Sequence, residues 1–86
     1  MKDKNVITVI VRSFIPLLEP SEGFNLGEPF KITIPEGMTS GELAQKILSK
    51  NVNQLGIVAV NGKKASENTI LAEGDKIDLY ALLDGG

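Results

Sequence analysis

The sequence predicts a single small α+β domain, and three observations indicate it. The 86 residues are too few for a second core, because domains usually contain ~100–200 residues. A segment rich in β-branched residues near the start of the chain and an alternating segment near its end are typical of strands. One segment between them has helical periodicity. We expect residues 1–82 to form the domain and residues 83–86 to form a flexible tail.

The composition excludes several classes of function. The chain has no Cys, no His and no Trp, which argues against Cys- or His-based nucleophiles, zinc sites, iron–sulfur clusters and disulfides. Nine basic against eleven acidic residues give a net charge of −2, without the basic footprint of a nucleic-acid-binding protein. No apolar run approaches the ~20 residues of a membrane span or has the features of a signal peptide. We expect a cytoplasmic protein that binds neither nucleic acid nor membrane.

The first strand is predicted at residues 5–14. Side chains alternate between the two faces of a strand, and the wholly apolar face that should line the core carries Ile7, Val9 and Val11. The other face, which should stay open, carries Thr8, Ile10, Arg12 and Phe14. Residues 15–29 are rich in Pro and Gly and predict a loop. A second strand at residues 30–34 should pair with the first as a wide hairpin. Its inward side chains should be Phe30, Ile32 and Ile34.

One helix is predicted over about residues 40–50. Thr39 and Glu42 have the spacing of a capping box, in which each side chain accepts a hydrogen bond from the other residue's backbone N–H. Helical spacing then gives an apolar stripe consisting of Leu43, Ile47 and Leu48. Residues 51–56 should form a loop.

The C-terminal part predicts a tight hairpin and a last strand. Residues 57–60 form a short apolar strand, and Asn61-Gly62 is a strong hairpin signal because both residues tolerate positive φ. Residues 63–65 should pair back, and residues 66–72 should be irregular with Ile70 and Leu71 buried. A second turn, Glu73-Gly74-Asp75, leads into the last strand at residues 76–82. Its inward face should carry Ile77, Leu79 and Ala81, and its outward face Asp78, Tyr80 and Leu82.

The order of these elements predicts a β-grasp, a mixed sheet of four to five strands wrapped on one helix. Two hairpins can bury one helix between them only if the last strand lies beside the first and parallel to it. One face of the sheet then stays uncovered. On this face the first and last strands should bring together their outward residues, which are Arg12, Phe14, Tyr80 and Leu82. An exposed Phe beside an exposed Tyr is typical of a protein-binding hot spot, although single exposed apolar residues are also ordinary.

No group of side chains has the spacing of a catalytic site. Asp75 and Asp78 are best explained as a turn former and a solvated residue, and the Gly-x-x-x-x-Gly-Lys spacing of a phosphate loop is missing. Lys63 and Lys64 fit a solvated hairpin end, with the docking of an acidic partner as the alternative. An enzyme in its own right is therefore disfavoured.

The terminal Gly85-Gly86 is the strongest candidate for a reactive site. Gly has no Cβ, so such an end can enter a channel too narrow for other residues. A four-residue tail from Leu83 reaches roughly 13 Å beyond the strand. It would deliver a free α-carboxylate into the active site of another protein. The alternative is an ordinary frayed end.

Four segments together carry a resemblance to a known family. They are Ile34-Pro35-Glu36-Gly37-Met38-Thr39 with Leu43, Val60-Asn61-Gly62, Leu71-Ala72-Glu73-Gly74-Asp75-Lys76-Ile77 and Gly85-Gly86. In this order they resemble the ThiS/MoaD sulfur-carrier proteins, ubiquitin-like β-grasp proteins of thiamine and molybdopterin biosynthesis. Residues 11–19 resemble the molybdopterin branch more than the thiamine branch.

The resemblance implies a co-substrate and not a catalyst, with no bound cofactor. A ubiquitin-activating-type adenylating enzyme would use ATP to convert the Gly86 carboxylate to an acyl-adenylate, and a sulfur donor would displace AMP to leave a thiocarboxylate. The sulfur would pass to a cofactor precursor in a synthase large subunit or a thiazole synthase. Partner contacts are expected at Arg12, Phe14, Tyr80, Leu82, Leu83 and Asp84. The alternatives are a ubiquitin-like protein modifier and a non-reactive β-grasp binding or regulatory domain.

Overall fold

The chain begins with the predicted antiparallel hairpin. The computed structural model describes residues 5–16 and 25–82, and its first two strands are β1 (Val6–Ser13) and β2 (Phe30–Pro35). The registered pairs on the inner face are Ile7 with Ile34, Val9 with Ile32, and Val11 with Phe30. The alternation read from the sequence is thus confirmed for both strands. The predicted site residues Leu83, Asp84, Gly85 and Gly86 lie outside the described residues.

The helix α1 (Ser40–Leu48) starts at the predicted capping box. The Thr39 Oγ1 accepts from the Glu42 N–H at 3.2 Å, and Glu42 Oε1 accepts from the Thr39 N–H at 3.0 Å. The helix ends two residues earlier than predicted, because Ser49 adopts a φ of 53°. A 3₁₀ helix, η1 (Ser49–Gln54), follows where the sequence predicted a loop. The buried positions of α1 are Ser40, Leu43, Ala44 and Leu48, while Ile47 of the predicted stripe is only partly buried.

The tight hairpin joins β3 (Leu55–Val60) to β4 (Lys63–Ala65). Asn61 and Gly62 have φ values of 54° and 84°, as a type I′ turn requires. The Asn61 side chain also ties this turn to the next one: its Nδ2 donates to Asp75 Oδ1 at 2.9 Å, and its Oδ1 accepts from the Lys76 N–H at 3.0 Å.

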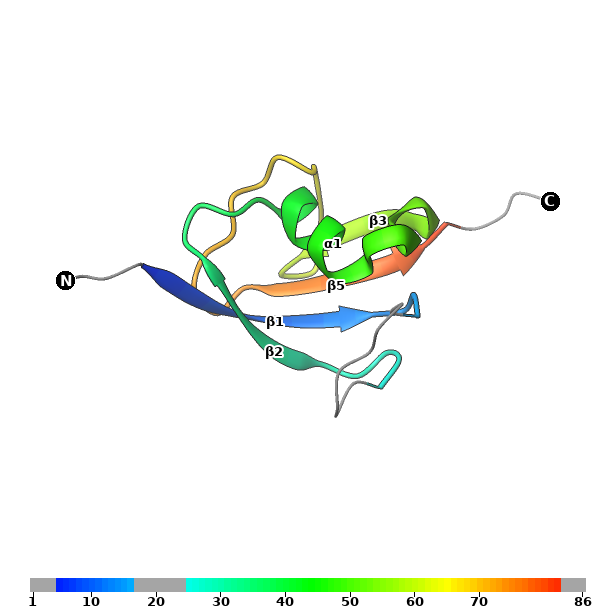
Figure 1. The fold of residues 1–86 in the computed structure, drawn as a ribbon, viewed down its shortest axis with the longest axis horizontal. Coiled ribbons are helices and arrows are strands. Elements are labelled where there is room, and N and C mark those ends of the chain that lie inside the picture. The colour runs from blue at the N-terminus through cyan, green and yellow to red at the C-terminus, as the bar shows by residue number, and fades with distance from the viewer. Residues whose placement is uncertain (1–4, 17–24, 83–86) are drawn as a thin grey trace.

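The last strand, β5 (Lys76–Ala81), is the centre of the sheet. It pairs parallel with β1 and antiparallel with β3, and the strand order is β2-β1-β5-β3-β4. Figure 1 shows β1 and β5 running side by side in the same direction, with α1 lying across one face of the sheet. The predicted mixed sheet on one helix is confirmed, with five strands. No helix in residues 5–16 and 25–82 is long and apolar enough to cross a membrane.

Two residues expected to point inward, Ile70 and Ala81, are exposed. Ile70 is 67% exposed, whereas its neighbour Leu71 is only 3% exposed. The segment is extended here, since Ile70 forms an antiparallel bridge with Thr39, and neighbouring side chains of an extended chain point to opposite sides. Only one of the two can therefore enter the core. Ala81 is exposed because it forms the last pair of the sheet, opposite Leu55.

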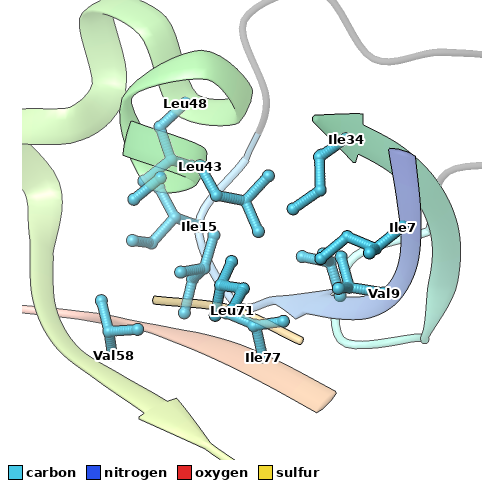
Figure 2. Packing of buried hydrophobic residues seen from close by; sticks show 12 residues of the cluster. Ile7, Val9, Ile15, Ile34, Leu43, Leu48, Val58, Leu71 and Ile77 are labelled. Carbon is cyan, nitrogen blue, oxygen red and sulfur yellow. The ribbon is translucent and has the colours of Figure 1, made fainter. Parts of the chain in front are cut away.

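The core fills the space between α1 and the sheet, and it contains one residue that the sequence prediction placed in a loop. Ile15 is fully buried and lies next to Leu43 in Figure 2. Ser13 folds the chain inward after β1, because its Oγ donates to the Ile15 carbonyl at 2.7 Å and accepts from the Ile15 N–H at 3.1 Å. Burying such a side chain contributes ~1.5–3 kcal/mol.

Candidate functional site

Among the described residues, no helix or strand covers the face of the sheet opposite α1 (Figure 1). Cross-strand register orders the side chains of this face in rows. One row runs from Arg12 on β1 to Asp78 on β5 and Ala59 on β3. The next row, towards the end of β5, contains Phe14, Tyr80 and Ile57. The candidate site is built from these two rows.

Arg12 and Asp78 form an ion pair between the parallel strands β1 and β5. The contact has two hydrogen bonds, from Nε to Oδ1 at 2.9 Å and from Nη2 to Oδ2 at 3.0 Å. The pKa of Arg12 lies above its usual value, mainly because of the hydrogen bond to Asp78 and then because of the attraction of its charge. The Asp78 side chain is only 13% exposed, so its interpretation as a solvated residue is corrected: it anchors Arg12. Asp75 is a turn residue as predicted, since its Oδ2 accepts from the Ala72 N–H at 2.8 Å.

The two outward aromatic residues are stacked on each other. The ring centroids of Phe14 and Tyr80 are 5.0 Å apart and the ring planes differ by 4°. The guanidinium carbon of Arg12 lies 5.4 Å from the Phe14 centroid, within range of a cation–π contact. Both aromatic residues keep more than a third of their surface exposed. The structure thus brings together three of the predicted partner-binding residues.

The fourth, Leu82, lies where β5 ends. Its side chain is 59% exposed, and its N–H donates to the Gln54 carbonyl at 2.7 Å. This bond holds the backbone of Leu82 against the end of η1. The remaining predicted site residues come after Leu82 and lie outside the described residues.

Two residues at this end of the sheet were not singled out from the sequence. Ile57 is 45% exposed and is registered opposite Tyr80, so it extends the apolar surface onto β3. Gly56 stands at an irregularity in the pairing, between the pairs Leu55–Ala81 and Ile57–Tyr80. A Gly before a short apolar strand is a signal for a bulge or a close backbone approach, and it could have identified this position.

We call Phe14, Ile57, Tyr80 and Leu82 the apolar patch. Its members come from the end of β1, from β3 and from the end of β5, and Arg12 stands beside it with its charge held by Asp78. Aromatic side chains with an Arg next to them are the residue types enriched in protein–protein interfaces. The composition of the patch is that of an interface.

Comparisons with known proteins agree with this architecture. The model of the ThiS family matches residues 24–86. No curated protein matches the chain in sequence. Among solved structures, the chain is similar to one in the complex of subunits 1 and 2 of molybdopterin-converting factor from Helicobacter pylori 26695, with 28% identity, a TM-score of 0.55, and coverage of 93% of this chain and 100% of that one.

Two further solved structures share the fold. Caldiarchaeum subterraneum ubiquitin is 14% identical, with a TM-score of 0.64 and coverage of 95% of this chain and 100% of that one. SAMP1 from Haloferax volcanii is 18% identical, with a TM-score of 0.61 and coverage of 92% and 99% respectively. These similarities confirm the ubiquitin-like β-grasp fold.

Proposed function

The chain belongs to the ThiS family of small carrier proteins, and on that premise we propose that it carries sulfur as a thiocarboxylate on its C-terminal Gly86. The observation that carries the proposal is the family match, which runs through Gly85-Gly86, together with the position of the strand that precedes them. β5 is held on both sides by β1 and β3, so the domain gives the C-terminal residues a fixed base.

The proposed chemistry has two steps at the C-terminal carboxyl group of Gly86. A carboxylate oxygen first attacks the α-phosphorus of ATP and releases pyrophosphate, which makes the acyl-adenylate. A hydrosulfide ion released by a sulfur donor then forms a carbon–sulfur bond at the acyl carbon as the carbon–oxygen bond to AMP breaks, so that AMP and a proton leave and the thiocarboxylate remains. The activating enzyme supplies the catalytic groups, and the carrier supplies the acyl group and a docking surface.

The apolar patch supports the proposal that the carrier supplies a docking surface. It lies at the end of β5 from which the chain leaves the sheet, so a partner that binds the patch has its active site within reach of the C-terminal residues. Asp84, next to Gly85-Gly86, adds a negative charge that the partner must match with a cation or leave in contact with water. We propose that the adenylating enzyme and the sulfur-accepting synthase bind this patch in turn.

The similarity at 28% identity favours molybdopterin synthesis as the pathway. In the Helicobacter pylori complex, subunits 1 and 2 of molybdopterin-converting factor are bound to each other. We propose by analogy that this chain pairs with the large subunit of a synthase. Thiamine synthesis, with a thiazole synthase as the acceptor, is the alternative. The family match does not separate the two pathways, because it does not include residues 11–19, the segment that resembles the molybdopterin branch.

Reconstitution tests the proposal. The full chain is incubated with ATP, a sulfur donor and the adenylating enzyme of its own organism, and intact-mass spectrometry monitors the product. We expect an AMP adduct without the donor, and replacement of one oxygen by sulfur with it. A Gly86-deleted chain is the control and should show neither product.

A protein modifier is the second candidate, because the chain shares its fold with a ubiquitin over 95% of its length. The same acyl-adenylate would then pass Gly86 to a lysine amine and form an isopeptide bond. Conjugates of higher mass, with a Gly86–lysine linkage in their tryptic peptides, would identify this role in place of sulfur transfer.

A further inference from the structure

Two lysines flank one apolar residue on the open face, in a row that the proposed sulfur chemistry does not use, and a third lysine lies in the next row. Ile10 on β1 is registered with Lys31 on β2 and with Lys76 on β5, so both lysines flank it on the same face. Directly opposite residues have Cβ atoms about 4.5–5.5 Å apart. In the neighbouring row, Lys64 on β4 is registered with Ala59, which is itself registered with Asp78. We call Lys31, Lys64 and Lys76 the lysine band.

The positive charge of this band is not neutralised within the described residues. All three lysines of the band are exposed. Among the described residues, Asp78 is the carboxylate that faces them from β5, and it is already paired with Arg12. At the nearby turn, Glu73 accepts from the Thr8 N–H and Asp75 from the Ala72 N–H, so both carboxylates are held by backbone. The chain as a whole has a net charge of −2. The open face therefore has the opposite sign to the rest of the molecule.

The surface between the lysines is hollowed. An open hollow of about 730 Å³ is lined by Ile10, Pro29, Lys76, the Arg12–Asp78 ion pair and the Asn61-Gly62 turn, and a smaller one of about 260 Å³ by Ile10, Pro29, Phe30 and Lys31. Half-buried Ile10 forms an apolar floor to both. The shape and composition suit a segment that places an apolar side chain on Ile10 and acidic side chains towards the lysines.

We propose that the lysine band and Ile10 bind an acidic segment of a protein partner, as an extension of the apolar patch. We identify that partner as the enzyme that activates the carrier, and this identity rests on the proposed function. Ile10 lies on β1, four residues before Phe14, so it is roughly 13 Å from the patch, a distance that one protein interface spans. Nucleic acid is disfavoured as the occupant because the net charge of −2 repels a polyanion.

The first test uses charge reversal in the full chain. The double variant Lys31→Glu/Lys76→Glu should raise the KM for the carrier in adenylation about tenfold, because it puts like charges together and removes electrostatic steering. The matched control, Lys46→Glu/Lys50→Glu, makes the same change of net charge at exposed positions of α1 and η1, and it should leave KM within twofold of wild type by the ordinary tolerance of surface changes. Rising salt should raise the KM of wild type and weaken the difference. Equal KM values for the two double variants would overturn the inference.

The second test does not depend on sulfur chemistry. A short synthetic peptide of alternating Glu and Leu is titrated into the isotope-labelled chain, with a Gln-for-Glu peptide and a single-stranded oligothymidylate as comparisons. We expect amide shifts confined to residues around Ile10, Lys31, Gly62 and Lys76, and their loss in Lys31→Glu/Lys76→Glu. Equal shifts with the Gln peptide, or tighter binding of the oligonucleotide, would contradict the proposed occupant. If wild type is never adenylated while this map is as expected, the proposed function fails and the acidic-segment surface stands.

Discussion

Gly56 lies directly against the backbone of Leu82: a Cβ at position 56 would be 2.9 Å from the Leu82 Cα and 3.0 Å from the Ala81 carbonyl oxygen. No side chain fits at such a distance without a shift of the backbone. The same two segments are joined by the bond from the Leu82 N–H to the Gln54 carbonyl. The close contact at Gly56 therefore fixes the position of the Ala81–Leu82 backbone at the end of β5.

The first prediction concerns this position. Gly56→Ala should displace the Ala81–Leu82 backbone and lower kcat of adenylation at least tenfold, because misplacement of a reacting group by about 1 Å can cost far more than that. Gly41→Ala is the matched control, since a Cβ there would be 2.8 Å from Glu67 Cβ, equally crowded but against Glu67 and not against the backbone of Ala81 and Leu82. Both variants should lose ~1–3 kcal/mol of unfolding free energy. If Gly41→Ala and Gly56→Ala lose adenylation activity to the same extent, the effect of Gly56→Ala comes from lost stability alone.

The second prediction concerns the stacked rings of the apolar patch. Tyr80→Ala and Phe14→Ala should each weaken binding of the adenylating enzyme by roughly 2 kcal/mol, as expected for aromatic residues at the centre of an interface. Calorimetric titration measures the effect. Ile70→Ala removes an exposed apolar side chain at the Thr39 bridge and should not change affinity. If all three variants bind alike, the patch is not the docking surface.

The third prediction concerns Ile15. Ile15→Ala should lower the free energy of unfolding by ~2–5 kcal/mol, because it leaves a cavity beside Leu43. Ile70→Ala, which removes the same atoms from an exposed site, should change it by no more than about 0.5 kcal/mol. Urea denaturation monitored by circular dichroism compares them. Similar midpoints would show that Ile15 does not belong to the core.

The fourth prediction concerns the start of α1. Thr39→Ala removes the acceptor for the Glu42 N–H and should cost ~1 kcal/mol of unfolding free energy. Glu42→Gln keeps an oxygen that can accept from the Thr39 N–H and should be milder than Thr39→Ala. Thermal unfolding of both variants at one pH provides the comparison, and a larger loss in Glu42→Gln would contradict a role of the hydroxyl.

Local patterns were sufficient to predict most of the fold. Alternation identified the inward faces of β1 and β2, the spacing of Thr39 and Glu42 identified the start of α1, and Asn61-Gly62 identified the β3–β4 turn. The parallel pairing of β1 with β5 could be inferred from the need to bury one helix between two hairpins. These features depend on residues close in sequence or on topology alone.

The features that the sequence could not predict depend on the path of the chain beyond regular elements or on contacts between distant segments. Ile15 has no periodic neighbours, and its burial depends on the two hydrogen bonds of Ser13. The pairing of Arg12 with Asp78 requires the register of two strands 66 residues apart, which alternation does not fix. The role of Gly56 likewise depends on the path of Leu82, and Ile70 loses its place in the core to Leu71.

The most direct test of the carrier role is the intact mass of the chain purified from its own cells, with and without its adenylating enzyme. We expect a fraction of the chains to end at Gly86 with one oxygen replaced by sulfur, and this fraction should disappear in cells lacking the enzyme. Chains that end in an unmodified carboxylate in both strains, or that continue beyond Gly86, would contradict it.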